Sequence, residues 1–352
     1  MRYVDLAAGR RLQVVAYDDT QAHTRNHADA AAAVDELLGG GYANWHVETT
    51  SRSLQVRVTK KGRVLTHSGP PSGAEPSRSH DRAKARLVPG DAPYLRALGI
   101  ADADGRIRPS RQGKLRQIEE FVRDLSAALD DAWASGALRQ PTDAEPLRVA
   151  DLGCGNAYLT FAAQHHLASR GVPAHFIGVD VKEQSRDHNA SVAASLDLSA
   201  QMEFVVGSID GVALDPRPDV VLALHACDTA TDDALARGVG WTAPLILAAP
   251  CCHHDIARQL REVGAPAPYD LLVRDGILRE RLADTLTDGL RAARLRAEGY
   301  RVDVIEFVPS EHTPRNTLLR AVRTGTVGTR EEYDALVAAW SLRPRLGELL
   351  AP

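Results

Sequence analysis

The stretch from Leu147 to Thr160, which reads LRVADLGCGNAYLT, constrains the fold of this chain most strongly. A short apolar run leads to Gly153 and Gly155, and a helix-like pattern begins at Tyr158, so the stretch predicts a strand, a glycine turn and a helix. Glycines let the backbone pass close to a bound molecule, and a helix N-terminus offers unpaired N–H groups. The dinucleotide fingerprint G-x-G-x-x-G needs a third glycine where Tyr158 stands, which argues against NAD or FAD.

Four further apolar runs follow at regular spacing and are separated by helical segments. The five predicted strands span residues 147–152, 175–180, 202–206, 219–224 and 244–249. Near-continuous apolar strands are typical of a parallel sheet that is covered on both faces, so we expect an α/β sandwich. Asp180 ends the second strand, where such a sheet presents an acid to a ribose diol. We therefore expect S-adenosylmethionine (SAM) as the cofactor, with a different nucleotide as the alternative.

The residues expected to bind SAM follow the first three strands. They are Asp151, Gly153, Gly155, Asn156 and Tyr158 near the first strand, Asp180 at the second, and Ser208, Ile209 and Asp210 after the third. The first group is expected at the methionine end of the cofactor, Asp180 at the ribose and the third group at the adenine.

Composition favours a cytoplasmic protein. The chain has 352 residues, enough for two domains, and its 44% hydrophobic and 25% charged residues are ordinary for a soluble globular protein. We expect no signal peptide and no membrane association, because the longest apolar run, Leu245 to Cys252, is too short to span a bilayer. The four cysteines suit reduced thiols better than a disulfide framework.

The charge is unevenly distributed. Residues 51–125 hold 16 Lys and Arg against 8 Asp and Glu, although the whole chain has a net charge of −4. A basic front half on an acidic protein indicates a polyanionic partner, and we expect RNA and no DNA; a solvated basic face is the alternative. The expected RNA contacts in this half are Lys60, Lys61, Arg82, Lys84 and Arg86.

Two later motifs carry a family resemblance: HACDTATD at 225–232 and PCCHH at 250–254. They resemble the H-x-C-G-x-A-T-D and C-C-H-H elements of a class I SAM-dependent methyltransferase superfamily, which includes eukaryotic tRNA ribose 2′-O-methyltransferases and a bacterial group. For the bacterial group the resemblance extends over most of the chain, and for the tRNA enzymes it covers residues 147–255. The chain departs from the tRNA enzymes at Asp228, where they carry glycine, and it lacks their N-terminal zinc modules.

This resemblance implies a Rossmann-like sheet of seven strands whose last hairpin, at 300–308 and 317–322, is antiparallel. The expected organisation is a small basic α/β module, a helical connector, the methyltransferase domain and a helical tail, at residues 1–88, 89–140, 141–326 and 327–352 respectively. Within the first module we expect a helix at 23–38 and a hairpin that turns at 60–62.

The expected catalytic residues follow the fourth and fifth strands. They are His225 and Cys227 after the fourth strand, and His253 and His254 after the fifth. Methyl transfer mainly demands alignment of the acceptor, and a hydroxyl acceptor also needs a base, for which we expect His225. His253 and His254 are expected to hold the acceptor, together with three residues of the late hairpin: His312, Arg315 and Asn316.

Clustered Cys and His also have the ligand types of a zinc site. Neighbouring residues on an extended segment point to opposite sides, however, so Cys251 and Cys252 are expected not to share an ion, and we expect no metal. The simpler expectation is that Cys154, Cys251 and Cys252 are small buried hydrophobic residues and that one histidine of the cluster is a hydrogen-bonding residue of the core. The alternatives to an RNA methyltransferase are a methyltransferase for a protein or small molecule, and a non-catalytic SAM- or zinc-binding scaffold.

Overall fold

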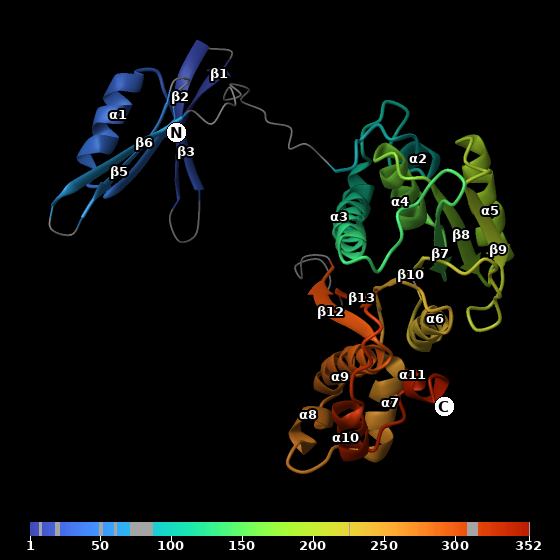
Figure 1. The fold of residues 1–352 in the computed structure, drawn as a ribbon. Coiled ribbons are helices and arrows are strands. Elements are labelled where there is room, and N and C mark those ends of the chain that lie inside the picture. Colours follow the sequence, from blue (N-terminus) through green and yellow to red (C-terminus); the bar gives the residue numbers. More distant parts are fainter. Residues whose placement is uncertain are drawn as a thin grey trace. The chain divides into compact units, whose positions relative to one another are not determined.

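The computed structural model describes residues 1–6, 9–17, 22–48, 52–59, 62–70, 87–224, 226–307 and 316–351. The chain divides into two compact units, Met1–Ala85 and Arg86–Pro352 (Figure 1). Among the described residues, no helix is both long enough and apolar enough to cross a membrane.

The second unit is built on a seven-stranded sheet in the order β12-β13-β11-β10-β7-β8-β9 (Figure 1). The strands β7 to β11 pair in parallel, whereas β13 runs antiparallel to both β11 and β12. This order confirms the predicted α/β fold, its seven strands and its antiparallel end. The bounds are β7 Leu147–Leu152, β8 Ala174–Asp180, β9 Met202–Val206, β10 Val220–Ala223, β11 Leu245–Ala248, β12 Tyr300–Glu306 and β13 Thr317–Arg323.

Helices cover both faces of this sheet. On β7, Leu147 and Val149 face one core cluster with α3, α4 and α5, whereas Ala150 and Leu152 face a second cluster with α6 and α9. This alternation follows from the two-residue period of a strand. The helices are α2 Pro93–Ala97, α3 Gln112–Ala134, α4 Tyr158–Ser169, α5 Glu183–Ser195, α6 Thr229–Gly240, α7 His254–Val263, α8 Asp270–Arg274, α9 Gly276–Ala297, α10 Glu331–Trp340 and α11 Arg345–Leu349.

The topology sets where a ligand can bind. Strand order reverses between β7 and β10, because β8 and β9 lie on one side of β7 while β10 and β11 lie on the other. In an open parallel sheet, ligands bind beyond the carboxyl ends of the strands at such a switch point. The glycine turn after β7 therefore stands at the expected position.

The described residues of the first unit form two three-stranded antiparallel sheets and one helix. The first sheet comprises β1 Arg2–Leu6, β2 Gly9–Tyr17 and β3 Ala22–His27; the second comprises β4 Asn44–Glu48, β5 Ser53–Val58 and β6 Val64–Gly69; the helix is α1 Ala30–Gly39. The prediction of a helix from residue 23 is wrong for its first part, since residues 22–27 pair with β2 as strand β3. The helix begins only after Asp29, whose carboxylate accepts hydrogen bonds from the N–H groups of Ala31 and Ala32.

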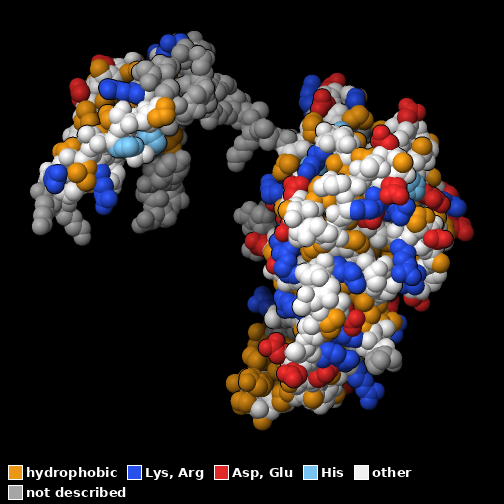
Figure 2. Space-filling model, viewed as in Figure 1, with side chains coloured by type: hydrophobic (Ala, Val, Ile, Leu, Met, Phe, Trp, Pro, Cys, Tyr) orange, Lys and Arg blue, Asp and Glu red, His pale blue; other side chains and the backbone are white. Residues whose placement is uncertain are grey.

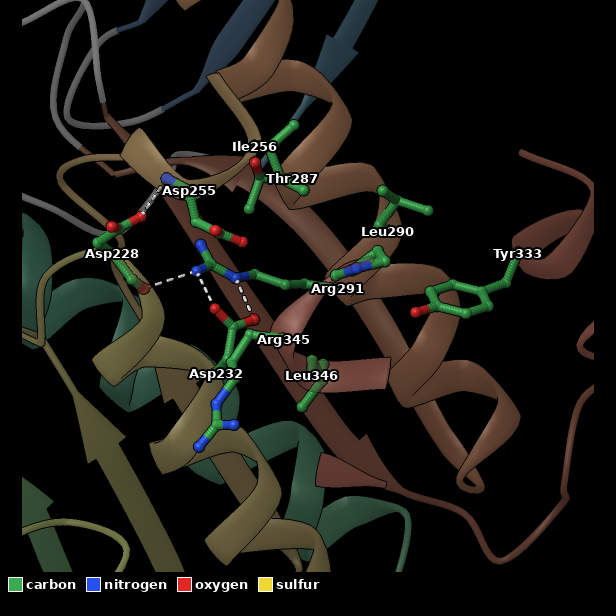
Figure 3. Close-up of a pocket in the computed structure, with 11 residues that line it drawn as sticks. Asp228, Asp232, Asp255, Ile256, Thr287, Leu290, Arg291, Tyr333, Arg345 and Leu346 are labelled. Carbon is green, nitrogen blue, oxygen red and sulfur yellow. Dashed lines mark hydrogen bonds and ion pairs between the residues drawn. The ribbon is translucent and has the colours of Figure 1, made fainter. Parts of the chain in front are cut away.

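A buried arginine on α9 joins α9 to α6. Arg291 is 2% exposed, and its Nε and Nη2 donate to the two carboxylate oxygens of Asp232 at 2.9 and 2.7 Å (Figure 3). The same Nη2 donates to the main-chain oxygen of Asp228 at 2.8 Å. The pocket around this arginine holds about 10 Å³, room for about one water molecule, and so does not admit a cofactor.

Removing one partner of this buried pair should be costly, because the other charge would remain buried without compensation. Arg291→Met is expected to lower the free energy of unfolding by about 3–5 kcal/mol. The double variant with Asp232→Asn should be more stable than Arg291→Met alone. Urea denaturation followed by circular dichroism measures both, and Arg258→Met, which changes an exposed arginine on α7, is the control. Equal stability of Arg291→Met and Arg258→Met would contradict this role.

Candidate active site

The glycine turn after β7 is held by its neighbours on one side and is open on the other. Gly153 and Cys154 both donate their N–H groups to the main-chain oxygen of Val179, at 2.8 and 3.1 Å. Asn189 of α5 donates its side-chain amide to the oxygen of Gly155 at 2.7 Å. Gly155 has φ +53°, and a Cβ placed on it would meet no atom within 4 Å. The turn therefore presents a fixed backbone with free space above Gly155.

Asp180 ends β8 directly beside this turn. Its Oδ2 accepts a hydrogen bond from the N–H of Gly155 at 2.9 Å, and its Oδ1 accepts one from the N–H of Lys182 at 3.0 Å. Each carboxylate oxygen has a second lone pair, so the group can still accept two hydroxyl hydrogen bonds. Asp180 thus has the position and the capacity of a ribose-binding acid.

Asp151 places a second carboxylate beneath the turn. It is 2% exposed, and its Oδ2 accepts a hydrogen bond from Thr160 at 2.5 Å, whereas its Oδ1 has no hydrogen-bond partner among the described residues. Burial raises the pKa of Asp151 to about 7; the Thr160 bond opposes the shift and the charge of Asp180 adds to it. A buried oxygen without a partner is costly, and a cationic ligand group would satisfy it.

The other residues expected at the cofactor divide into two groups. Gly207 donates its N–H to the main-chain oxygen of Asp180 at 3.0 Å, which places the loop with Ser208, Ile209 and Asp210 next to the predicted ribose position. Tyr158, in contrast, is buried, and its hydroxyl donates to Gln117 of α3 at 2.7 Å. The side chain of Tyr158 thus packs between α3 and α4, and its expected cofactor role stays a prediction. Asn156 is exposed on the turn itself.

Three residues of this region were missed by sequence reasoning, namely Thr160, Asn189 and Gln117. Thr160 and Asn189 hold Asp151 and Gly155, and Gln117 holds Tyr158. Thr160 lies nine residues after Asp151 in the same motif, so a local search for a hydroxyl partner could have found it. Asn189 and Gln117 come from distant helices, and their contacts depend on the packed fold.

Replacing Asp180 by Asn should weaken SAM binding while keeping the shape of the side chain. Loss of one charged hydrogen-bond acceptor in the site is expected to cost about 1–3 kcal/mol, or about 5- to 150-fold in Kd. Isothermal titration calorimetry with SAM measures the change. Asp187→Asn on α5, where Asp187 pairs with Arg186 at the surface, is the matched control and should bind like the wild type. Identical SAM affinities of the two variants would exclude Asp180 from the site.

The loop after β10 lies against the glycine turn. A Cβ on Gly153 would come within 3.5 Å of the Cα of Ala226, so the turn and the loop approach each other closely. Asp228 has φ +53°, a backbone conformation that favours glycine. Its Oδ1 accepts a hydrogen bond from the N–H of Asp255 at the start of α7, at 3.0 Å. Asp228 thus caps a neighbouring helix.

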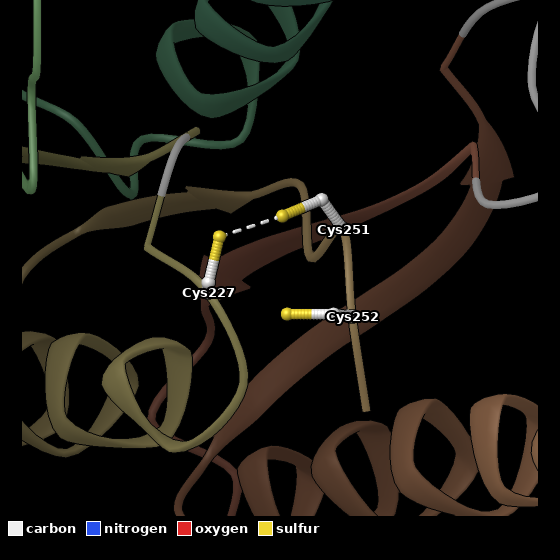
Figure 4. A group of neighbouring side chains, drawn as sticks. All are labelled: Cys227, Cys251 and Cys252. Atoms are coloured by element: carbon white, nitrogen blue, oxygen red, sulfur yellow. Dashed lines mark hydrogen bonds between the residues drawn. The ribbon is translucent and has the colours of Figure 1, made fainter. Parts of the chain in front are cut away.

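Three cysteines gather at the ends of β10 and β11 (Figure 4). Cys227 and Cys251 have their sulfur atoms 2.9 Å apart, and the three sulfurs of Cys227, Cys251 and Cys252 all lie within 4.8 Å of one another. The expectation that Cys251 and Cys252 point to opposite sides is wrong, because their sulfur atoms lie within 4.8 Å of each other. Cys251 is exposed rather than buried, whereas Cys154 is buried as predicted.

The two histidines after β11 differ in environment. His253 is 2% exposed; its Nε2 lies 2.9 Å from Oδ1 of Asp288 and its Nδ1 3.0 Å from Oδ1 of Asp284. The prediction that His253 holds the acceptor is corrected, because both ring nitrogens face carboxylates of α9. His254 is the first residue of α7 and is exposed.

The remaining predicted residues fall mostly outside the described part of the chain. These are His225, expected to act as base, and seven expected substrate contacts: Lys60, Lys61, Arg82, Lys84, Arg86, His312 and Arg315. Asn316 is described, and its side-chain amide donates to Oε1 of Glu306 on β12 at 2.8 Å.

His253 should make stability depend on pH. Burial lowers its pKa, but Asp284 and Asp288 outweigh burial, so the pKa of His253 is raised above its ordinary value. The stabilisation is thus fully present below the unfolded pKa of about 6.5 and is lost as pH rises through the folded pKa. The stability gap between wild type and His253→Gln should therefore shrink from mildly acidic to mildly alkaline pH. Thermal unfolding across this range measures the gap. A gap that widens with pH, or that matches the gap of the control His254→Gln, would contradict this account.

Comparison with known proteins identifies the class of this region. Residues 113–259 match the family model described as a methyltransferase domain. No curated protein matches the chain in sequence. The chain therefore contains a methyltransferase domain, which includes the glycine turn, Asp180 and the cysteines. SAM is its cofactor, and the open space above Gly155, the free lone pairs of Asp180 and the unsatisfied Oδ1 of Asp151 fit that molecule.

Solved methyltransferase structures share low similarity with the chain. An SAH-bound methyltransferase from Podospora anserina is 11% identical with a TM-score of 0.39, and the match covers 67% of this chain and 88% of that one. The ribosomal protein L11 methylase from Lactobacillus delbrueckii subsp. bulgaricus is 13% identical with a TM-score of 0.35, covering 62% and 84%. A geranyl diphosphate methyltransferase in complex with SAM is 12% identical with a TM-score of 0.34, covering 65% and 94%.

Proposed function

We propose that this protein is a cytoplasmic SAM-dependent methyltransferase that methylates RNA, either tRNA or rRNA. The second unit supplies the methyltransferase domain, and the first unit binds the RNA. SAM supplies a methyl group on a positively charged sulfur. Asp151 and Asp180 hold the cofactor, and the residues after β10 and β11 line the acceptor side.

The observation that favours RNA most is a groove on the second sheet of the first unit. This groove, about 430 Å³ in volume, runs over β4, β5 and β6, and its lining includes Trp45, His46, Arg57 and His67. The strand register places His46, Gln55 and His67 in one cross-strand row, and Asn44, Arg57 and Leu65 in the next. Cross-strand partners share one face of a sheet, so this face combines amide, imidazole and guanidinium groups. Figure 2 shows histidine and basic side chains on the visible surface of this unit.

Such a surface suits single-stranded or looped RNA better than a small apolar substrate. Imidazole rings stack on unpaired bases, and Arg pairs with phosphates. The basic excess of residues 51–125 adds the electrostatic attraction that a polyanion needs.

We assign the part of the domain that binds the methyl acceptor from the position of His225 in the sequence. In the sequence, His225 comes two residues after the last residue of β10, and the transferred methyl is expected near the carboxyl end of that strand. If the acceptor is a hydroxyl, a histidine there can remove its proton near neutral pH. Replacing His225 is then expected to lower turnover rather than SAM affinity.

One labelling experiment separates the substrate classes. The full chain is incubated with SAM carrying a radioactive methyl group and with separate RNA, protein and small-molecule fractions of cell extract. Label in the RNA fraction, lost after ribonuclease treatment, is the expected result. Label confined to protein or small metabolites would overturn RNA as the acceptor, and no transfer to any fraction would favour a non-catalytic scaffold.

RNA affinity should fall steeply with salt, because each phosphate that the protein neutralises releases counterions. Arg57→Glu, and the pair Lys60→Glu and Lys61→Glu, should each weaken binding and reduce the slope of log K against log salt by about 0.7–0.9 for every phosphate that is no longer neutralised. Fluorescence anisotropy of a labelled tRNA measures both quantities. Arg258→Glu on α7 is the charge-matched control from the other unit. Salt-independent binding, or equal slopes in all variants, would contradict the assigned surface.

A further inference from the structure

We propose that Cys227, Cys251 and Cys252 together bind a zinc ion at the carboxyl ends of β10 and β11. The proposal concerns metal binding only and holds whatever the methyl acceptor is.

The sheet topology brings the three thiols together. Strands β10 and β11 pair in parallel with Ala223 opposite Ala248, so the segments that follow them leave the sheet side by side. Cys227 comes from the first segment, and Cys251 and Cys252 come from the second, as Figure 4 shows. Their sulfur atoms lie within 4.8 Å of one another. Zinc with Zn–S bonds of about 2.3 Å in a tetrahedron holds its thiolates roughly 3.8 Å apart, so small side-chain rotations suffice.

The three thiols are close enough to share one ion. The sulfur atoms of Cys227 and Cys251 lie 2.9 Å apart, and all three sulfurs lie within 4.8 Å of one another. Thiols are weak hydrogen-bond partners for each other. A divalent cation binds such sulfurs better, because a coordinated thiol loses its proton.

A hydrogen bond ties together the two segments that carry the thiols. Asp228, next to Cys227, has φ +53°, and its Oδ1 accepts a hydrogen bond from the N–H of Asp255 at 3.0 Å. Asp255 lies three residues after Cys252, so this bond holds the segment after β10 against the segment after β11.

Convergence of three sulfurs favours a metal over a disulfide. A disulfide between Cys227 and Cys251 would use two cysteines and leave the third, Cys252, at the same place without a role. Soft thiolate ligands select zinc among the common divalent ions. Cys227 and Cys251 are exposed and Cys252 is partly exposed, whereas Cys154 is buried, so an ion from solution can reach the cluster.

Among the residues that the structure describes, three cysteines form the group, and no further Cys, His, Asp or Glu joins it. Three protein ligands with a water molecule in the fourth position are typical of catalytic zinc. The neighbouring Ala226 touches the glycine turn at Gly153, so the ion would lie on the acceptor side of the domain.

Metal content of the purified full chain tests the proposal. Without a polyhistidine tag, and from zinc-supplemented culture under reducing conditions, the wild type should carry about one zinc per chain by plasma mass spectrometry. Cys227→Ser, Cys251→Ser and Cys252→Ser should each lose most of it, while Cys154→Ala should retain it. Cobalt added to the zinc-free protein should give a thiolate-to-cobalt absorption band in the wild type and not in the three serine variants.

Any of the following results would overturn the proposal. The first is wild-type protein that is folded by circular dichroism and reduced by thiol titration but binds neither zinc nor cobalt. The second is unchanged zinc content in any of the three serine variants. The third is a full complement of iron or copper in place of zinc, or a Cys227–Cys251 disulfide found by mass spectrometry in freshly purified protein.

Discussion

The hydrogen bond between the Asp180 carboxylate and the N–H of Gly155 shapes the carboxyl ends of β7 and β8, where SAM is expected to bind. It ties the end of β8 to the turn after β7, which in turn donates two N–H groups back to Val179 of β8. The same carboxylate retains lone pairs for a ribose. Because one group both shapes the turn and faces the ligand, the turn has its binding conformation before SAM arrives, which lowers the ordering cost of binding.

Near the carboxyl ends of β10 and β11, a buried network of charged side chains holds three helices in place. Arg291 pairs with Asp232, Asp288 pairs with His253, and Asp228 caps α7. The network joins α6, α7 and α9, and therefore positions the segments that leave β10 and β11. Those segments carry the three cysteines and the loop that touches the glycine turn. The ion pairs and hydrogen bonds among α6, α7 and α9 thus help to set the geometry of the segments that follow β10 and β11.

Sequence predicted the central elements because their signals are local. The apolar run before Gly153 predicted strand β7 with its bounds. What it could not predict depends on tertiary contacts. The local sequence of β3 was predicted as helix, and it forms a strand because it pairs with β2. The convergence of Cys251 with Cys252, the burial of His253 and the strained backbone of Asp228 depend on segments distant in the chain. The predicted cofactor acids followed from topology, whereas their supporting partner Asn189 did not.

A crystal structure of the full chain with S-adenosylhomocysteine tests the central claim most directly. The account predicts the adenosyl group over the carboxyl ends of β7, β8 and β9, with the ribose hydroxyls on Asp180 and the amino acid end above Gly155. The Oδ1 of Asp151 should gain a partner from the ligand, directly or through water. Ligand density at any other place on the chain, or none at a concentration that saturates binding in solution, would contradict the assignment of this edge as the SAM site.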